Sequence, residues 1–264
     1  MTKLVHTPEA LAAALPAGPI SLVPTMGALH DGHLALVRAA KALGNPVVVS
    51  IFVNPLQFAP GEDLDNYPRT LPEDVAKLEA LGVDAVFAPS AETVYPHGPR
   101  TTIQPGRLGA VLEGATRPTH FAGVLTVVAK LFALTRATDA FFGEKDYQQL
   151  ALIRQMVEDL HFPVRIHGCP IVRDTDGLAL SSRNRYLSAQ ERAIALAIPR
   201  ALATGSLSEA RSLLDATEGL ELDYLVTTAP DMTDLPADYT GPARMLVAAK
   251  VGATRLLDNA PIEL

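Results

Sequence analysis

The stretch that decides the fold is Pro24-Thr25-Met26-Gly27-Ala28-Leu29-His30-Asp31-Gly32-His33. It follows a short apolar run at 20–23, which is typical of a strand, and it precedes a run at 34–43 whose composition is helical. We therefore predict a strand-to-helix turn, with the helix beginning near Gly32 or His33. Such a helix presents unpaired backbone N–H groups and the positive end of its dipole to an anion. Two imidazoles with a glycine between them can donate to phosphate oxygens, so the pattern predicts a nucleoside triphosphate as ligand.

The pattern His30-Asp31-Gly32-His33 resembles the His-x-Gly-His signature of a nucleotidyltransferase superfamily that includes class I aminoacyl-tRNA synthetases and small adenylate-forming ligases. On its own the spacing is weak evidence, because two histidines three residues apart also occur by chance. The alternative is that one histidine is exposed and the other caps the helix. Other segments of the sequence are needed to distinguish between these two interpretations.

The composition predicts a globular protein with a buried core. Of the 264 residues, 48% are hydrophobic and 19% are charged, which argues against disorder. The net charge of -7 argues against a nucleic-acid partner, since binding to a phosphate backbone needs clustered Lys and Arg in excess. The single cysteine, Cys169, favours a reducing compartment and is typical of a small buried hydrophobe rather than a nucleophile.

No membrane segment is expected from the sequence. Residues 1–6 lack the charged start and continuous apolar core of a signal peptide. The most apolar later stretch, 124–134, contains Lys130 and is too short to cross a bilayer. We therefore expect a cytoplasmic protein with no membrane partner.

Strand-like and helical runs alternate through the first two thirds of the chain. Strands are expected at 20–23, 47–53, 83–88, 139–142 and 164–168, and helices at 34–43, 72–81, 120–135 and 146–160. A further helix is expected to open at Thr7-Pro8 and to end before Gly18. The alternation predicts an α/β fold, a Rossmann-like parallel sheet with helices on both faces, whose ligands bind beyond the carboxyl ends of the strands.

The pattern changes near Val172. Turn residues at 174–177 are followed by a capping box, Ser188 to Glu191, with a helix to about 203 and another at about 208–215. Strand-like runs follow at 221–228, 243–250 and 254–258. We predict two domains, residues 1–172 with the Rossmann-like sheet and residues 173–264 with a smaller C-terminal α+β fold.

Amides follow the second expected strand. Asn54 and Gln57 come directly after it, at the edge where a parallel sheet binds its ligand. An amide can donate to a carboxylate and accept from a hydroxyl. The alternative is an ordinary Asn-Pro turn with an exposed glutamine.

The segment after the fourth expected strand carries a second set of polar groups. Gly143 permits close backbone approach, Lys145 offers a compact cation for phosphates, and Gln149 lies on the same helix face as Lys145. The alternative is an ordinary helix start with a solvated lysine, although acidic residues are the ones that favour a helix start.

The loop between the two expected domains carries Ser181, Ser182 and Arg183. Two hydroxyls and a guanidinium suit triphosphate oxygens, whereas the alternative is a serine-rich linker with a surface arginine. Three separate loops with phosphate donors argue against coincidence. The sequence contains neither Gly-x-x-x-x-Gly-Lys-Ser/Thr nor Gly-x-Gly-x-x-Gly, so P-loop and dinucleotide-binding interpretations lack support.

Taken together, the segments 24–33, 52–58, 67–70, 143–149 and 181–184 resemble the pantothenate synthetase (pantoate:β-alanine ligase) family, as does the ending 248–259. The resemblance implies that the carboxylate of (R)-pantoate attacks the α-phosphate of ATP, which gives pantoyl adenylate and pyrophosphate. The amine of β-alanine then attacks the acyl carbon and releases AMP and pantothenate. The resemblance also implies Mg2+ with ATP, a homodimer and a lid-like C-terminal domain.

The resemblance further implies roles for particular residues. The catalytic donors would be His30, His33, Lys145, Ser181, Ser182 and Arg183, with His33 as a proton donor. ATP would be bound by Met26, Gly27, Ala28, Leu29, His30, Asp31, Gly32, His33, Gly143, Glu144, Lys145, Asp146, Val172, Leu180, Ser181, Ser182 and Arg183. The substrates would be bound by Asn54, Gln57 and Gln149, and Gln57 would also meet β-alanine. Asp74 matches a position associated with Mg2+, although it also suits the first turn of a helix.

Three positions depart from the family pattern, and two rival functions stay open. Leu180 stands where methionine is usual, and Thr119 and Ala122 differ from the commoner residues in their loop. The first rival is another adenylate- or cytidylyl-forming enzyme of the same superfamily. The second is a nucleotide-binding module without catalysis, for which the acidic composition disfavours RNA as a ligand.

Overall fold

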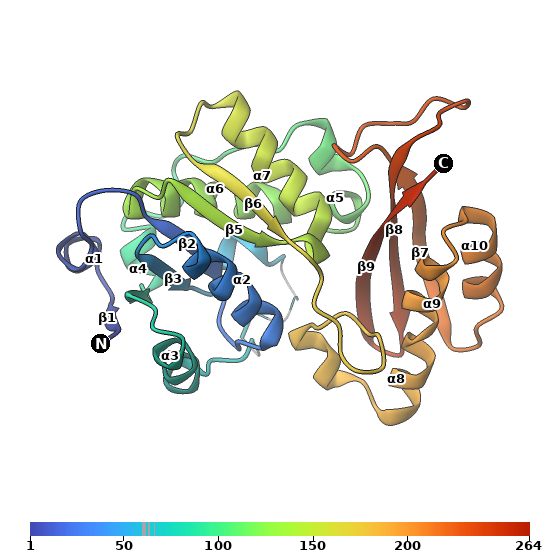
Figure 1. Cartoon of the computed structure of the whole chain (residues 1–264), viewed down its shortest axis with the longest axis horizontal. Coiled ribbons are helices and arrows are strands. Elements are labelled where there is room, and N and C mark those ends of the chain that lie inside the picture. Colours follow the sequence, from blue (N-terminus) through green and yellow to red (C-terminus); the bar gives the residue numbers. More distant parts are fainter. Residues whose placement is uncertain (60–61, 63, 66) are drawn as a thin grey trace. The chain divides into compact units, whose positions relative to one another are not determined.

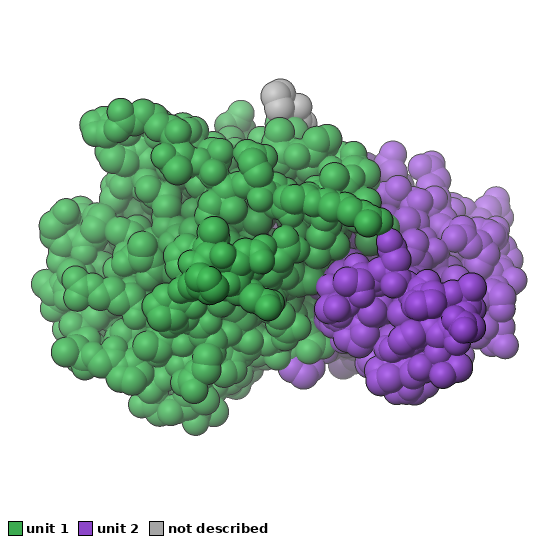
Figure 2. Space-filling view, turned by 90° about the horizontal axis from the view of Figure 1, so that it is seen from above, with its two compact units in different colours: residues 1–144, 148–169 green, residues 145–147, 170–264 purple. Residues whose placement is uncertain are grey.

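The computed structural model of the chain describes residues 1–59, 62, 64, 65 and 67–264. It divides into two units, coloured separately in Figure 2: residues 1–144 with 148–169, and residues 145–147 with 170–264. The turn 145–147 therefore belongs with the C-terminal unit, although its neighbours in sequence belong to the first unit. The predicted domain boundary after residue 172, and the predicted roles of the two domains, stay predictions.

The first unit is built on a six-stranded sheet in which neighbouring strands are parallel, with the order β1-β4-β3-β2-β5-β6 (Figure 1). The strands are β1 (Lys3–Val5), β2 (Ser21–Thr25), β3 (Val47–Ile51), β4 (Ala85–Phe87), β5 (Asp139–Gly143) and β6 (Arg165–Cys169). The predicted fold class is confirmed, and five of these strands are expected ones. Strand β1 was not predicted, because three residues at a sheet edge carry too little pattern to be recognised.

Helices form the connections between these strands. They are α1 (Pro8–Ala14), α2 (Asp31–Ala42), α3 (Leu71–Ala80), α4 (Ala91–Val94), α5 (Glu113–Thr116), α6 (His120–Thr135) and α7 (Tyr147–Asp159). Short 3-10 turns are η1 (Pro55–Gln57), η2 (Arg107–Ala110) and η3 (Glu144–Asp146). Thr7 caps α1 by accepting the Ala10 N–H at 3.2 Å, as its sequence predicts. Among the described helices, none is both long and apolar enough to cross a membrane.

Successive residues of the central strands pack into two cores, one on each face of the sheet. Leu22 and Val48 pack on the face covered by α1, α6 and α7. Val23 and Val49 pack on the other face with α2 and α3. Figure 1 shows α6 and α7 on one side of the sheet and α2 and α3 on the other. Because side chains alternate along a strand, burial of both faces explains the continuous apolar run in β3.

The second unit contains a three-stranded antiparallel sheet with the order β7-β8-β9. The strands are β7 (Leu220–Thr228), β8 (Pro242–Val251) and β9 (Thr254–Glu263), and the helical elements are η4 (Ser182–Tyr186), α8 (Ala189–Ala195), α9 (Ala197–Ala203) and α10 (Leu207–Asp215). Helix residues Ile198 and Leu214 pack in one core with Met245 and Val247 of β8. The predicted α+β fold of this region is therefore confirmed.

Two element bounds in the second unit were predicted wrongly. The single helix expected after Ser188 is divided at Leu196, and Pro199 in the first turn of α9 has no N–H with which to continue a helical ladder. The last strand runs on to Glu263, beyond the expected end at 258. It tolerates Pro261 because β9 lies at the edge of its sheet.

A buried carboxylate stabilises the amino ends of β5 and β6. Asp139 is fully buried and accepts hydrogen bonds from Arg165 Nε at 3.0 Å and Nη2 at 3.2 Å. His167 Nε2 lies 2.8 Å from Asp139 Oδ1, and the Thr138 hydroxyl donates to Oδ2 at 2.9 Å. Burial by itself raises the pKa of Asp139, but the hydrogen bonds, foremost those from Arg165, outweigh it and hold the pKa below its ordinary value of 3.8.

We expect the free energy of unfolding to fall as the pH is lowered below the ordinary pKa of Asp139. The unfolded carboxyl takes up its proton first, so this stabilisation is fully present above that pKa and is lost as the pH falls through the lowered one. Denaturant unfolding between about pH 6 and about pH 3 should show a weaker acid dependence in Asp139→Asn. The exposed control Asp215→Asn should behave as wild type. An unchanged acid dependence in Asp139→Asn would show that this carboxylate does not stabilise the fold.

Candidate active site

Three predicted segments of the first unit follow three neighbouring strands. Residues 26–33 follow β2, and Asn54 and Gln57 follow β3. Gly143 is the last residue of β5, and Glu144 comes directly after it. The sheet order places β3, β2 and β5 side by side, so all three segments lie at one edge of the sheet. From β2 the chain continues to β3 and β4 on one side of β2, and then returns to β5 on the other side, so the direction of the connections reverses between β2 and β5. In open parallel sheets, ligands bind at such a switch point.

A second buried carboxylate shapes the turn after β2. Asp74 of α3 is fully buried, and its two oxygens accept the backbone N–H groups of Ala28 at 2.9 Å and Leu29 at 2.8 Å. The Thr70 hydroxyl donates to the same carboxylate at 3.0 Å. Gly27 and Ala28 both have positive φ, +86° and 52°, which is unusual for the alanine. The carboxylate thus stabilises a turn that the local sequence alone does not favour.

The two histidines are joined in a capping box at the start of α2. His30 is the N-cap, and its Nδ1 accepts the Gly32 N–H at 3.2 Å, while His33 Nδ1 accepts the His30 N–H at 3.3 Å. The helix begins at Asp31, slightly earlier than predicted. Because both Nδ1 atoms accept, we assign the proton of each neutral ring to Nε2. A capping role and a phosphate-donor role are therefore compatible, since they use different ring nitrogens.

Asn54 fixes the amide of Gln57. Asn54 is fully buried, and its Nδ2 donates to Gln57 Oε1 at 3.0 Å and to the Gly123 carbonyl at 3.1 Å. Its Oδ1 accepts the Tyr95 hydroxyl at 2.9 Å. Burial raises the pKa of Tyr95 to about 12, which keeps this hydroxyl a donor. The alternative of an exposed glutamine is wrong, because Gln57 is 9% exposed.

Several residues that support this loop were not identified from sequence. Arg117 Nη2 donates to the Gln57 carbonyl at 3.1 Å, and His120 Nδ1 lies 3.0 Å from the same oxygen. A Cβ at Gly123 would lie 2.2 Å from the Leu56 carbonyl oxygen, so α6 packs directly on η1. The sequence signal for them is the polar segment 117–120, which carries a guanidinium and an imidazole.

Gln148, the neighbour of Gln149, was also missed. Its Nε2 donates to the carbonyls of Leu108 at 2.7 Å and Val111 at 2.8 Å, and its Oε1 accepts the Glu113 N–H at 3.1 Å. Gln148 is buried, whereas Gln149 is half-buried. The two adjacent amides therefore differ in role: one holds a loop, and the other is accessible to a ligand.

The second unit brings together three predicted donors from distant parts of the chain. Lys145, Ser181 and Arg183 line one small pocket, together with Arg255 and Asp258. Arg255 is ion-paired with Asp223, and Asp258 with Arg173, so Lys145 and Arg183 are the two lining cations that suit an anion. The lysine ammonium lies 3.5 Å from Asp146, which is half exposed, so the ion pair is weak.

The loop that carries the serines is ordered by backbone bonds. Leu180 N–H donates to the Val172 carbonyl at 2.9 Å, which brings two predicted ATP contacts side by side. Ser181 caps η4 by accepting the Arg183 N–H at 3.2 Å, and Ser182 is the first residue of η4. The serines therefore lie in a hydrogen-bonded loop and a capped 3-10 helix, whereas the alternative was a serine-rich linker without such structure.

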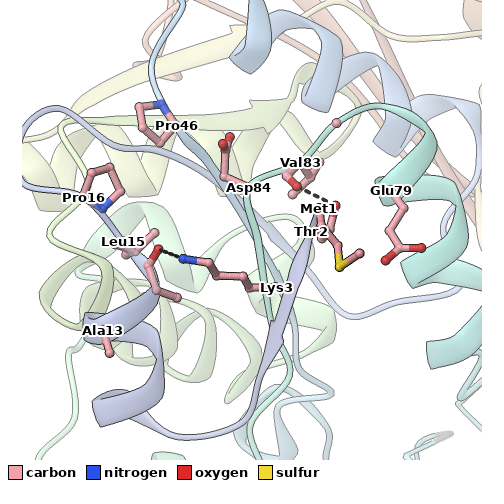
Figure 3. A pocket seen from close by; sticks show the side chains of 12 residues that line it. Met1, Thr2, Lys3, Ala13, Leu15, Pro16, Pro46, Glu79, Val83 and Asp84 are labelled. Atoms are coloured by element: carbon pink, nitrogen blue, oxygen red, sulfur yellow. Dashed lines mark hydrogen bonds between the residues drawn. The ribbon is translucent and has the colours of Figure 1, made fainter.

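A larger hollow in the first unit is lined by none of these residues. It has a volume of about 800 Å³ and is lined by Lys3, Pro46 and Asp84, among others (Figure 3). Pro46 and Asp84 directly precede β3 and β4, so the hollow lies at the amino ends of the strands. Its Lys3 ammonium donates to the Ala14 carbonyl at 3.1 Å. We do not assign it to the site, because ligands of parallel sheets bind at the opposite edge.

The described residues give no clustered metal site. No group of three or more His, Cys, Asp or Glu residues among them is arranged to hold a metal ion. Both oxygens of Asp74 already accept backbone N–H groups. A contact of Asp74 with Mg2+ stays a prediction.

Comparison with known proteins identifies the family. The sequence profile of the family described as pantoate-beta-alanine ligase matches residues 3–261, nearly the whole chain. The chain belongs to the pantoate-beta-alanine ligase family.

Relatives and solved structures agree with this family. Proteins named pantothenate synthetase from Corynebacterium jeikeium and Nocardia farcinica are each 62% identical over 93% of this chain, and the matches cover 83% and 80% of those proteins. A pantothenate synthetase structure from Thermus thermophilus has a TM-score of 0.92 at 48% identity, with 98% of both chains covered. A pantoate-beta-alanine ligase from Francisella tularensis, complexed with beta-gamma ATP and beta-alanine, has a TM-score of 0.85 at 37% identity and covers 98% of this chain and 97% of its own. The predicted family and fold class are confirmed.

We expect Asp74→Asn to destabilise the protein even without ATP or metal. The substitution replaces one carboxylate acceptor with an amide donor that faces a backbone N–H. One unsatisfied buried donor should lower the free energy of unfolding by about 1–3 kcal/mol. The adjacent exposed Glu73→Gln serves as the control. Wild-type stability of Asp74→Asn in denaturant, with only the metal dependence of activity altered, would contradict the structural role.

Proposed function

We propose that this member of the family catalyses the ATP-dependent ligation of (R)-pantoate and β-alanine to pantothenate, with release of AMP and pyrophosphate. The observation that carries the proposal is the family match over residues 3–261. The sheet-edge segments of the first unit and the cationic pocket of the second supply donor types that suit the reaction. We further propose that both sets of donors bind the same ATP.

The first step makes a mixed anhydride. The pantoate carboxylate is ionised at neutral pH, so it needs no general base to attack the α-phosphorus. Negative charge grows on the phosphate oxygens while the bond to pyrophosphate breaks, and prepositioned donors neutralise it. We assign this role to the Nε2–H groups of His30 and His33 and to Lys145, Ser181, Ser182 and Arg183, with His33 as a proton donor.

The second step forms the amide. The neutral amine of β-alanine attacks the acyl carbon of pantoyl adenylate, and the bond from that carbon to the AMP oxygen breaks. Pantoate offers hydroxyls and a carboxylate but no ammonium, so the neutral amides of Gln57 and Gln149 suit it. Asn54 would act mainly by orienting Gln57, since its own amide bonds both Gln57 and Gly123.

We extend the proposal to Mg2+, a homodimer and a cytoplasmic location. Mg2+ is usually held by substrate phosphates and one or two carboxylates, which fits a chain whose described residues form no dedicated metal cluster. When bound, the ion would neutralise charge on the triphosphate. A homodimer and a cytoplasmic location are expected from the family resemblance, and the single buried cysteine fits a reducing compartment.

The test of the function is an AMP-formation assay with ATP, pantoate and β-alanine, each omitted in turn. We expect AMP only in the complete mixture. Labelled pyrophosphate should exchange into ATP when pantoate is present and β-alanine is omitted. Exchange that needs a different acid or a phosphomonoester would favour another enzyme of the superfamily. Nucleotide binding with no AMP under any of these conditions would favour a non-catalytic module.

Gln149→Ala should weaken pantoate binding more than ATP binding. A hydrogen bond to a charged group contributes about 1.5–3 kcal/mol, so the pantoate Kd should rise about ten- to hundredfold. Calorimetry with each ligand measures both affinities. Gln155→Ala, an exposed position on the same helix, is the matched control. Equal losses for the two ligands would refute the assignment of Gln149 to pantoate.

A further inference from the structure

Asn259 on β9 is a buried polar residue for which the reaction above gives no role. It is 2% exposed and lies in the stretch 248–259, whose sequence resembles the family without an assigned function. A buried amide is costly unless it is hydrogen-bonded, and an apolar side chain would pack in a strand at lower cost. The contacts of Asn259 therefore need an explanation.

Asn259 connects β8 and β9 to the backbone of Lys145. Its Nδ2 donates to the Lys145 carbonyl at 3.0 Å, across 114 residues of sequence. Its Oδ1 accepts from Arg244 Nε at 2.8 Å. One side chain thus joins a strand of the sheet to the residue that carries the ammonium of the anion pocket.

Arg244 and Tyr147 complete this connection. The Arg244 guanidinium lies 4.0 Å from the centre of the Tyr147 ring, a close cation–π contact between two buried residues. The Tyr147 hydroxyl donates to the Pro230 carbonyl at 2.8 Å. The turn 145–147 is therefore held at both of its ends: Asn259 binds the carbonyl of Lys145, and Arg244 and Pro230 contact the side chain of Tyr147.

The neighbouring Asp258 holds the segment that brings Ser181 and Arg183 to the same pocket. It accepts two hydrogen bonds from Arg173, at 2.6 and 3.0 Å, and Arg173 also donates to the Gly177 carbonyl at 3.1 Å. These bonds fix the turn at 174–177, and a single antiparallel bridge between Arg173 and Ala179 leads from it to Ser181 and Arg183. Adjacent residues of one strand thus set the positions of both groups of donors.

We propose that Asn259 is a positioning residue that fixes the Lys145 ammonium relative to Ser181 and Arg183. The inference rests on the proposed function, in which Lys145 stabilises charge on the phosphates. An amide is needed at 259 because it donates to a carbonyl and accepts from a guanidinium at once, which neither a carboxylate nor a leucine can do. A donor displaced by about 1 Å can lose about a hundredfold in rate.

The test is a double-mutant cycle on kcat for pantoate-dependent AMP formation. Asn259→Asp keeps the acceptor for Arg244 but loses the donor to the Lys145 carbonyl. We expect kcat to fall about 10- to 100-fold with little change in the KM for pantoate, because Lys145 is assigned to the phosphates of ATP and not to pantoate. In a Lys145→Ala background the same substitution should change kcat less than about twofold, since it acts through Lys145.

Further variants separate positioning from folding. Arg244→Lys keeps the charge but lacks the planar guanidinium, so it should show the same dependence on Lys145 even where Asn259→Asp folds poorly. Tyr239→Phe removes a hydrogen bond to the Pro242 carbonyl in the same unit and should leave kcat unchanged in both backgrounds.

Wild-type kcat in Asn259→Asp, or equal fold losses with and without the Lys145 side chain, would overturn the positioning role while leaving the function intact. A wild-type protein that forms no AMP from the complete mixture would instead overturn the function, and the positioning role with it.

Discussion

The hydrogen bonds from Ala28 and Leu29 to the buried carboxylate of Asp74 are the constraint on which the site of the first unit depends. They hold the chain in a left-handed turn just after β2, so that His30 reaches the N-cap of α2. Lys77, one turn along α3, donates to the Leu29 carbonyl at 2.6 Å and secures the same turn from its other side. A helix from a different part of the sequence therefore positions the two imidazoles.

In the second unit, strand β9 has the corresponding role of positioning predicted ligand-binding residues. Lys145 and Arg183 lie far apart in sequence, yet they line one pocket because Asp258 and Asn259 bind the segments that carry them. Both units use buried polar side chains to hold the segments that carry the predicted ligand-binding groups. Adenylation requires such rigidity, since its catalysis consists mainly of donors fixed in advance where charge develops. Mobile donors would have to be ordered during each turnover.

The parts of the fold that could be predicted are those with a strong local pattern. Helix α6 was predicted at 120–135, where the structure has it, and the apolar runs of β2, β3 and β5 indicated buried parallel strands. The capping box at Ser188 was also visible, because its two partners are three residues apart. The break at Leu196 was not predicted, since the composition on both sides of it is helical.

The supporting contacts of the site could not be predicted, because their partners are distant in sequence. Asp74 lies 46 residues from Ala28, and its position in the first turn of α3 already offered a sufficient local explanation. Arg117 and His120 act on the Gln57 carbonyl, a backbone atom that leaves no trace in the residue pattern. Motifs show which residues meet a ligand, whereas the residues that hold them in place become visible only in the folded chain.

The central claim is that the pantoate carboxylate attacks the α-phosphorus of ATP held by these donors. Its most direct test is turnover of pantoate labelled with 18O in the carboxylate, followed by mass spectrometry of the products. The account predicts one 18O atom in AMP, one retained in pantothenate and none in pyrophosphate. Unlabelled AMP, or label in inorganic phosphate alongside ADP, would contradict attack at the α-phosphorus and the role given to the donors around it.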